Sequence, residues 1–218
     1  MDQAAARQVV GLYRELARRG MNAGSTGNVS LRTAAGMAIT PSGFSPDALT
    51  PKRVVEMALD GKARGKTAPS SEWEMHALIY TAYPQAHCIV HTHADACTAL
   101  ACLAEGLPAF HYMIANFGGN DVRCTGYATF GTRALADLAV AALAERSACL
   151  LANHGMIVHG QNADETLSRA ILLETLCRQY LLARAAGTVR LLTATEMQRA
   201  HQRFKYYGDR SNLIPPRL

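Results

Sequence analysis

The stretch Cys88-Ile89-Val90-His91-Thr92-His93 says most about how this chain folds. Its short, β-branched apolar run follows Pro84, which predicts a buried strand that ends at the histidines. Residues two apart on a strand point to the same face, so His91 and His93 are expected to project side by side. Cys88 falls on the opposite face and is excluded as their partner. Two imidazoles held on a stiff backbone are typical ligands of a zinc-like ion.

A third histidine occupies a similar setting. His154 closes the apolar run Cys149-Leu150-Leu151-Ala152-Asn153 and is followed by Gly155. Three histidines at strand ends leave at least one coordination position open, which is typical of catalytic rather than structural metal sites.

The remaining segments alternate between helical and strand periodicity. Helices are predicted over residues 3–19, 71–82, 94–104, 132–145, 162–185 and 195–206. Strands are predicted over residues 28–32, 37–40, 54–59, 86–92, 149–153 and 156–158. The hairpins imply antiparallel pairing, and several helices must cover the sheet, so we expect an α/β or α+β sandwich with one core. A length of 218 residues suits a single domain over 1–218.

Composition excludes several function classes. The formal charge is +5, but the lysines and arginines are scattered and no basic run alternates with aromatics, so nucleic-acid binding is not favoured. A modest positive balance suits an anionic metabolite such as a sugar phosphate. No apolar stretch is long enough to span a bilayer, and the first twenty residues do not resemble a signal peptide. We therefore expect a cytoplasmic protein that keeps its six cysteines reduced.

The segment Pro69-Ser70-Ser71-Glu72-Trp73-Glu74-Met75-His76 predicts the start of a helix, with Ser71 and Glu74 forming a capping box. A helix N-terminus with free N–H groups and serine hydroxyls also binds phosphate. Glu72 would then lie beside the anion and within reach of a metal or a substrate C–H. His76, four residues further on, shares the helix face of Glu72 and is a weaker candidate for a supporting role.

Two glycine-containing turns are candidates for the remaining walls of such an anion pocket. Ser25-Thr26-Gly27-Asn28-Val29-Ser30 precedes a predicted strand, and Thr40-Pro41-Ser42-Gly43 follows one. Glycine lets a phosphate approach the backbone, while Thr, Ser and Asn donate hydrogen bonds. The chain contains neither GxxxxGK[ST] nor GxGxxG, so these nucleotide-binding motifs are absent.

Taken together and in order, these motifs resemble the class II, zinc-dependent L-fuculose-1-phosphate aldolase family, within the wider group that includes L-ribulose-5-phosphate 4-epimerase. Further matching stretches are His111-Tyr112-Met113-Ile114-Ala115, Gly118-Gly119-Asn120 and Tyr127-Ala128-Thr129-Phe130-Gly131-Thr132-Arg133. The resemblance spans nearly the whole chain. It implies a three-layer α/β/α sandwich around a mainly antiparallel sheet, assembled as a homotetramer with the site at a subunit interface.

The resemblance also implies roles for individual residues. His91, His93 and His154 would hold one Zn²⁺ per subunit, with Mn²⁺ or Co²⁺ as alternative ions. Glu72 would be the acid/base and would also touch the metal when no substrate is bound. The implied phosphate ligands are Gly27, Asn28, Ser42, Gly43, Ser70 and Ser71.

Three aromatic residues acquire roles in the same way. Tyr112 would enter a neighbouring subunit's site as a proton donor. Phe130 would line the aldehyde side of the pocket, and Tyr207 would close over the bound substrate.

The implied reaction is the reversible cleavage of a ketose 1-phosphate to dihydroxyacetone phosphate and an aldehyde. A Schiff-base mechanism is not favoured, because none of the four lysines lies in a buried apolar run. The aldehyde stays open between L-lactaldehyde, acetaldehyde from a 5-deoxypentulose 1-phosphate, and a methylthio-aldehyde from methylthioribulose 1-phosphate. A sugar-phosphate 4-epimerase and a non-catalytic relative are the alternatives.

Overall fold

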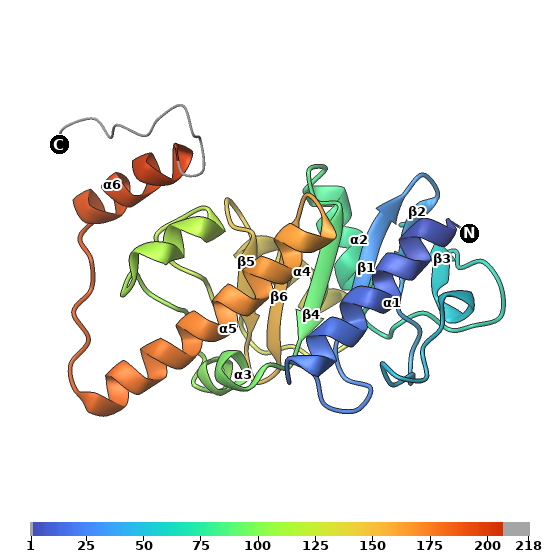
Figure 1. Ribbon diagram of the computed structural model, residues 1–218, viewed down its shortest axis with the longest axis horizontal. Coiled ribbons are helices and arrows are strands. Elements are labelled where there is room, and N and C mark those ends of the chain that lie inside the picture. Colours follow the sequence, from blue (N-terminus) through green and yellow to red (C-terminus); the bar gives the residue numbers. More distant parts are fainter. Residues whose placement is uncertain (1, 207–218) are drawn as a thin grey trace.

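The computed structural model describes residues 2–206 and contains one six-stranded sheet of order β3-β2-β1-β4-β6-β5 (Figure 1). Every neighbouring pair of strands is antiparallel. The strands are β1 (Asn28–Thr33), β2 (Gly36–Ile39), β3 (Val55–Met57), β4 (Cys88–Thr92), β5 (Ala148–Leu151) and β6 (Gly155–Gly160). The strand that carries the first histidine, β4, is therefore central, with neighbours on both sides.

Helices cover both faces of this sheet. The helices are α1 (Gln3–Arg18), α2 (Trp73–Ala82), α3 (Asp95–Cys102), α4 (Arg133–Ala142), α5 (Ala163–Ala186) and α6 (Ala194–Lys205), with short 3-10 helices η1 (Pro51–Arg53) and η2 (Tyr112–Phe117). Helices α1, α3 and α5 share one hydrophobic cluster with the sheet, and α2 and α4 share the other. The predicted three-layer α/β/α sandwich is thus confirmed.

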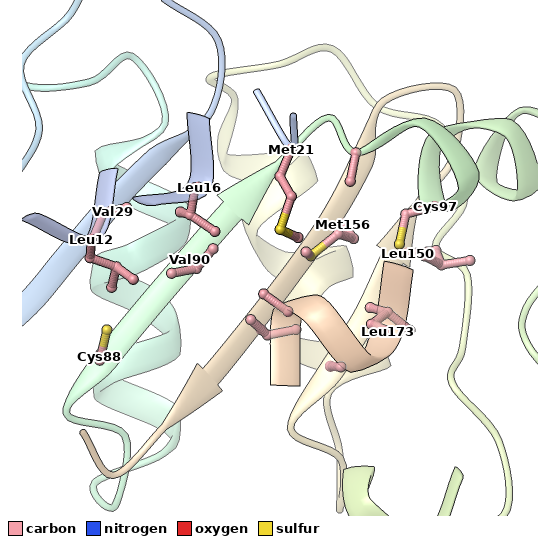
Figure 2. Packing of buried hydrophobic residues seen from close by; sticks show 14 of the residues in the cluster. Leu12, Leu16, Met21, Val29, Cys88, Val90, Cys97, Leu150, Met156 and Leu173 are labelled. Carbon is pink, nitrogen blue, oxygen red and sulfur yellow. The ribbon is translucent and has the colours of Figure 1, made fainter. Parts of the chain in front are cut away.

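Side-chain alternation along β4 divides the core in two. Cys88 and Val90 pack with Leu12, Leu16 and other residues of the α1 side (Figure 2). Ile89 joins the cluster on the α2 side, so His91, two residues further along, projects on that face as well. Cys88 is therefore a buried apolar contact on the face away from His91.

The start of α2 differs from the prediction. The helix begins at Trp73 after Glu72, and the predicted Ser71–Glu74 capping box is wrong: no side chain caps this end. Residues 70–72 form a turn instead, in which the Glu72 N–H donates to Ser70 Oγ over 3.3 Å. The turn leaves Ser71 exposed and directs Glu72 inward.

The ends of three other elements differ from the prediction in their boundary or in their capping bonds. Strand β5 ends at Leu151 rather than at residue 153, because Asn153 adopts φ 55° in the turn to β6. Asn162 caps α5 as predicted, but Glu165 accepts from the Gln161 N–H rather than closing a box on Asn162. A complete capping box that was not predicted opens α6 at Thr193.

Helix α6 lies apart from the sheet and packs against η2 (Figure 1). Phe204 of α6 stacks on Tyr112 of η2 with ring centroids 6.0 Å apart. None of the helices described over residues 2–206 is both long and apolar enough to cross a membrane.

Candidate active site

The structure brings His91, His93 and His154 into a nearly symmetric cluster. Their ring centroids are 4.8–4.9 Å apart and their ring planes cross at 70–73°. Their ligand atoms all lie within 4.8 Å of one another, close enough to share one metal ion. Converging imidazole nitrogens in this number are typical of catalytic zinc sites.

Hydrogen bonding determines which nitrogen of His91 faces the cluster. His91 Nδ1 donates to the carbonyl oxygen of Met156 on β6 over 2.9 Å. The lone pair of the neutral ring is then on Nε2, which points toward His93 Nε2 at 3.0 Å. The neighbouring strand therefore both orients the ring and selects the tautomer that suits metal binding.

A close backbone approach brings His154 to the other two histidines. The turn from β5 passes through Asn153 and reaches Gly155 against the end of β4. A Cβ atom at Gly155 would lie 2.4 Å from the carbonyl oxygen of Thr92, so only glycine permits this contact.

The carboxylate of Glu72 lies against the histidine cluster. Its Oε2 is 3.2 Å from His91 Nε2 and its Oε1 is 3.4 Å from His154 Nε2. Asn28 Nδ2 donates to Oε2 over 2.9 Å, whereas the buried Oε1 has no hydrogen-bond partner. A buried, orphaned carboxylate oxygen beside three imidazoles fits a divalent cation held by nitrogen and oxygen ligands.

The protonation behaviour of these groups follows from burial and mutual charge. Burial favours the neutral form of Glu72, but the charge and hydrogen bond of His91 outweigh it and hold the carboxyl pKa well below its usual range. Burial likewise disfavours protonation of His91, yet Glu72 outweighs it and raises the His91 pKa. Burial, reinforced by the charge of His91, lowers the pKa values of His93 and His154 to about 4. Both rings are therefore neutral at pH 7 and able to bind a cation.

A cavity of about 340 Å³ opens beside this cluster. Glu72, His93 and His154 form part of its wall, and all six predicted phosphate-binding residues line it. The other lining residues are Ser25, Thr26, Pro41, Tyr127, Ala128, Phe130 and Asn153.

Backbone pairing assembles the side of the cavity where the predicted phosphate-binding residues lie. The Ser42 N–H donates to the carbonyl oxygen of Ala68, and the Ser70 N–H donates to that of Thr40. These two bonds bring the turn at residues 40–43 against the loop that precedes α2. The third segment turns at Gly27, whose φ of +71° favours glycine and whose Cα lies close to the Asn22 side chain.

Of the aromatic residues with a predicted role, one lines the cavity and another does not. Phe130 lines the cavity, as predicted. Tyr127 lines it too, although no site role was predicted for this residue. Tyr112 is 53% exposed, stacks on His111 and Phe204, and is not among the residues lining the cavity of its own chain. Tyr207 lies outside the described residues.

The sandwich and this cavity together define a domain of the class II aldolase type. Residues 7–181 match the family described as Class II Aldolase and Adducin N-terminal domain, and the chain belongs to that family. The resemblance inferred from the sequence motifs is thereby confirmed.

Relatives with similar sequences are named as aldolases. The 5-methylthioribulose-1-phosphate/5-deoxyribulose-1-phosphate aldolase of Rhodospirillum rubrum is 44% identical over 203 residues, which cover 93% of this chain and 92% of the relative. The L-fuculose phosphate aldolase of Escherichia coli K12 is 41% identical over 206 residues, covering 94% and 96%. A solved L-fuculose 1-phosphate aldolase superposes with a TM-score of 0.90 at 36% identity, covering 94% of this chain and 98% of its own.

Proposed function

We propose that this protein is a zinc-dependent aldolase that reversibly cleaves a ketose 1-phosphate to dihydroxyacetone phosphate and an aldehyde. The observation that carries the proposal is the position of Glu72. Its carboxylate lies 3.2–3.4 Å from two histidines of a metal-binding cluster and lines the cavity that also holds the predicted phosphate ligands. A metal, a proton-transfer group and an anion pocket are the three elements that cleavage of a phosphorylated ketose requires.

The phosphate is assigned to the side of the cavity formed by the turns at Gly27 and Gly43 and by Ser70 and Ser71. Hydroxyl groups and positive-φ glycines in this arrangement suit an anion with several acceptor oxygens. Anchoring the phosphate there holds the reacting carbons in a fixed orientation, which by itself lowers the barrier substantially.

His91, His93 and His154 are the residues that would hold the zinc ion, with Glu72 as a further ligand in the absence of substrate. When bound there, zinc supplies Lewis acidity that polarises a carbonyl group. In the reverse direction the Glu72 carboxylate removes a proton from the carbon of dihydroxyacetone phosphate. In the cleavage direction the Glu72 carboxyl returns a proton to that carbon, and this gain is balanced by the proton that leaves the hydroxyl on the aldehyde side. The surroundings of Glu72 favour its ionised form, so in the absence of substrate Glu72 is a carboxylate that can act as a base.

Tyr112 is assigned to proton transfer at the hydroxyl on the aldehyde side of the cleaved bond, across a subunit boundary. The support is its exposure on η2 and its absence from the cavity lining of its own chain. A homotetramer with each site completed by a neighbour is the assembly we propose.

The aldehyde side of the cavity is assigned to Tyr127, Ala128 and Phe130. Two large aromatic side chains favour an aldehyde with a small apolar substituent over a phosphorylated one. The relatives are named for 5-methylthioribulose, 5-deoxyribulose and L-fuculose phosphates, and we propose a substrate from this set.

Release of dihydroxyacetone phosphate from these three ketose 1-phosphates, measured with zinc-loaded and chelator-treated protein, tests the proposal. We expect zinc-dependent release, and the preferred substrate identifies the aldehyde. Formation of an isomeric ketose phosphate without release would indicate the epimerase instead. A metal-loaded protein that does neither would contradict the proposed activity.

A further inference from the structure

A continuous chain of buried polar side chains leads from the protein interior to Glu72. Tyr80 OH lies 2.8 Å from Ser30 Oγ, which lies 2.7 Å from His76 Nδ1. His76 Nε2 lies 2.5 Å from Asn28 Oδ1, and Asn28 Nδ2 donates to Glu72 Oε2 over 2.9 Å. All five residues are buried, and Ser30 and His76 are fully so.

The two elements that carry this chain have matching periodicities. Asn28 and Ser30 are two apart on β1 and so share one face of the sheet. Glu72, His76 and Tyr80 are four apart at the start of and along α2, and so share one face of the helix. Packing α2 on this face of the sheet therefore interleaves the two sets.

Donor and acceptor chemistry gives the chain a single direction. A carboxylate only accepts, so the Asn28 amide must present its NH₂ group to Glu72 and its oxygen to His76. That oxygen only accepts, so His76 carries its proton on Nε2. His76 is fully buried and no carboxylate hydrogen-bonds to it, so the ring is neutral and its Nδ1 accepts from Ser30.

We propose that His76 is a positioning residue that holds Glu72 in place for proton transfer by locking the orientation of the Asn28 amide. Without the Nε2–H donor of His76, the Asn28 amide is free to rotate and turn its oxygen toward the Glu72 carboxylate. Two hydrogen-bond acceptors would then face each other, and no hydrogen bond could form between them. The carboxylate then loses the hydrogen bond from Asn28, which helps to hold it between His91 and His154. The inference rests on the proposed function, because it assigns Glu72 the proton transfer.

Two amide substitutions separate positioning from packing. The side-chain amide of His76→Gln reaches the place of Nε2 and can still donate to Asn28, whereas that of His76→Asn reaches only the place of Nδ1. The two side chains carry the same amide group and differ by one methylene, and the melting temperature of each variant reports the packing cost of that difference. The matched controls are His87→Gln and His87→Asn, at an exposed histidine that is not among the residues lining the cavity.

The assay is solvent hydrogen exchange at the carbon of dihydroxyacetone phosphate, with KM and kcat separated and the metal content and melting temperature of each variant recorded. We expect His76→Asn to lower kcat for exchange by about 10–100-fold with little change in KM, since partners of active-site groups carry effects of this size. His76→Gln is expected to restore most of that loss. Equal losses in both variants would mean that His76 only fills the core and would overturn the proposal.

A measurement on metal-free wild-type protein requires neither variant to fold nor the enzyme to turn over. Nitrogen-15 NMR distinguishes the two neutral tautomers of a histidine. We expect His76 to be protonated on Nε2, and a proton found on Nδ1 would reverse the chain and overturn the proposal. If wild-type protein shows no exchange at all, the proposed function fails, while the tautomer still decides the direction of the chain.

Discussion

His91 Nδ1 lies 2.9 Å from the carbonyl oxygen of Met156, so strand β6 orients an imidazole of the candidate metal site that strand β4 carries. The contact exists only in the observed register, in which His91 pairs with Ile157. Sheet pairing thus acts on the site directly, through a hydrogen bond to one of the three imidazoles.

Removal of one imidazole should abolish tight metal binding. Metal sites contribute about 10–16 kcal/mol, so the loss of one of about four ligands corresponds to roughly 3 kcal/mol, or about a hundredfold in affinity. We expect His93→Ala to weaken zinc binding at least this much in competition with a chelating dye. His87→Ala, at an exposed histidine outside the cluster, is the control. Unchanged, stoichiometric binding by His93→Ala would disprove the ligand assignment.

Glu72→Gln should separate metal binding from proton transfer. The amide keeps the shape of the side chain but cannot take up the substrate proton, so exchange at dihydroxyacetone phosphate should fall by about 10²–10⁴-fold. Zinc content should be retained because three histidines remain. Glu74→Gln, on the same helix and paired with Arg133 outside the cavity, is the control. Full exchange activity in Glu72→Gln would exclude this residue as the base.

Ser71→Ala should weaken phosphate binding without affecting the metal. Ser71 is exposed at the cavity and its hydroxyl is free of the helix-capping role first predicted for it. A hydrogen bond to a charged group contributes about 1.5–3 kcal/mol, so the inhibition constant of inorganic phosphate should rise about 10–100-fold. Ser168→Ala, at an exposed position of α5, should leave it unchanged. An unaltered constant in Ser71→Ala would remove this residue from the phosphate site.

Complementation tests whether Tyr112 acts in a neighbour's site. Tyr112→Phe should slow cleavage while phosphate inhibition stays the same, because only the phenol O–H is removed. Oligomers mixed from inactive Glu72→Gln and Tyr112→Phe subunits should regain part of the activity, since some sites then combine an intact Glu72 with an intact Tyr112. No recovery in oligomers shown to be mixed would place both groups in one subunit or exclude Tyr112.

Acid should destabilise the metal-free protein before its carboxylates titrate. Burial lowers the pKa of His76 to about 3, and those of His93 and His154 to about 4. The unfolded chain binds protons at these residues from about pH 6.5 downward while the folded chain does not, so the free energy of unfolding falls as the pH drops from about 6.5 to 4. The raised pKa of His91 opposes this change in stability. Burial also lowers the pKa values of His111 and His159, so histidines with a lowered pKa outnumber it.

Urea unfolding of chelated protein at pH 7 and pH 5 measures this slope. His76→Gln should flatten this slope, because it removes one of the histidines whose pKa is lowered, whereas His87→Gln should not. Equal stability at the two pH values would contradict the depressed pKa values.

The central strand and the pairing of His91 with His93 could be predicted because both depend on local periodicity. The turn that places Glu72 just before α2 could not be predicted, because Ser70 and Ser71 suit either a helix cap or a turn. Contacts of the Glu72 carboxylate with the histidine cluster accompany the turn. The link between His76 and Glu72 could not be predicted from the sequence either. The spacing of His76 from Glu72 was visible in the sequence, but the connection runs through Asn28, which only sheet packing brings between them.

The glycine at position 155 has a consequence for the order of events when the chain folds. His91 lies on β4 and His93 follows its end, but His154 reaches them only when the turn at Gly155 closes against the carbonyl of Thr92. A divalent ion therefore meets its full set of ligands only after β4 and β6 have paired. The candidate cation site is therefore a product of tertiary pairing, since it is complete only where the two hydrophobic clusters hold β4 and β6 together.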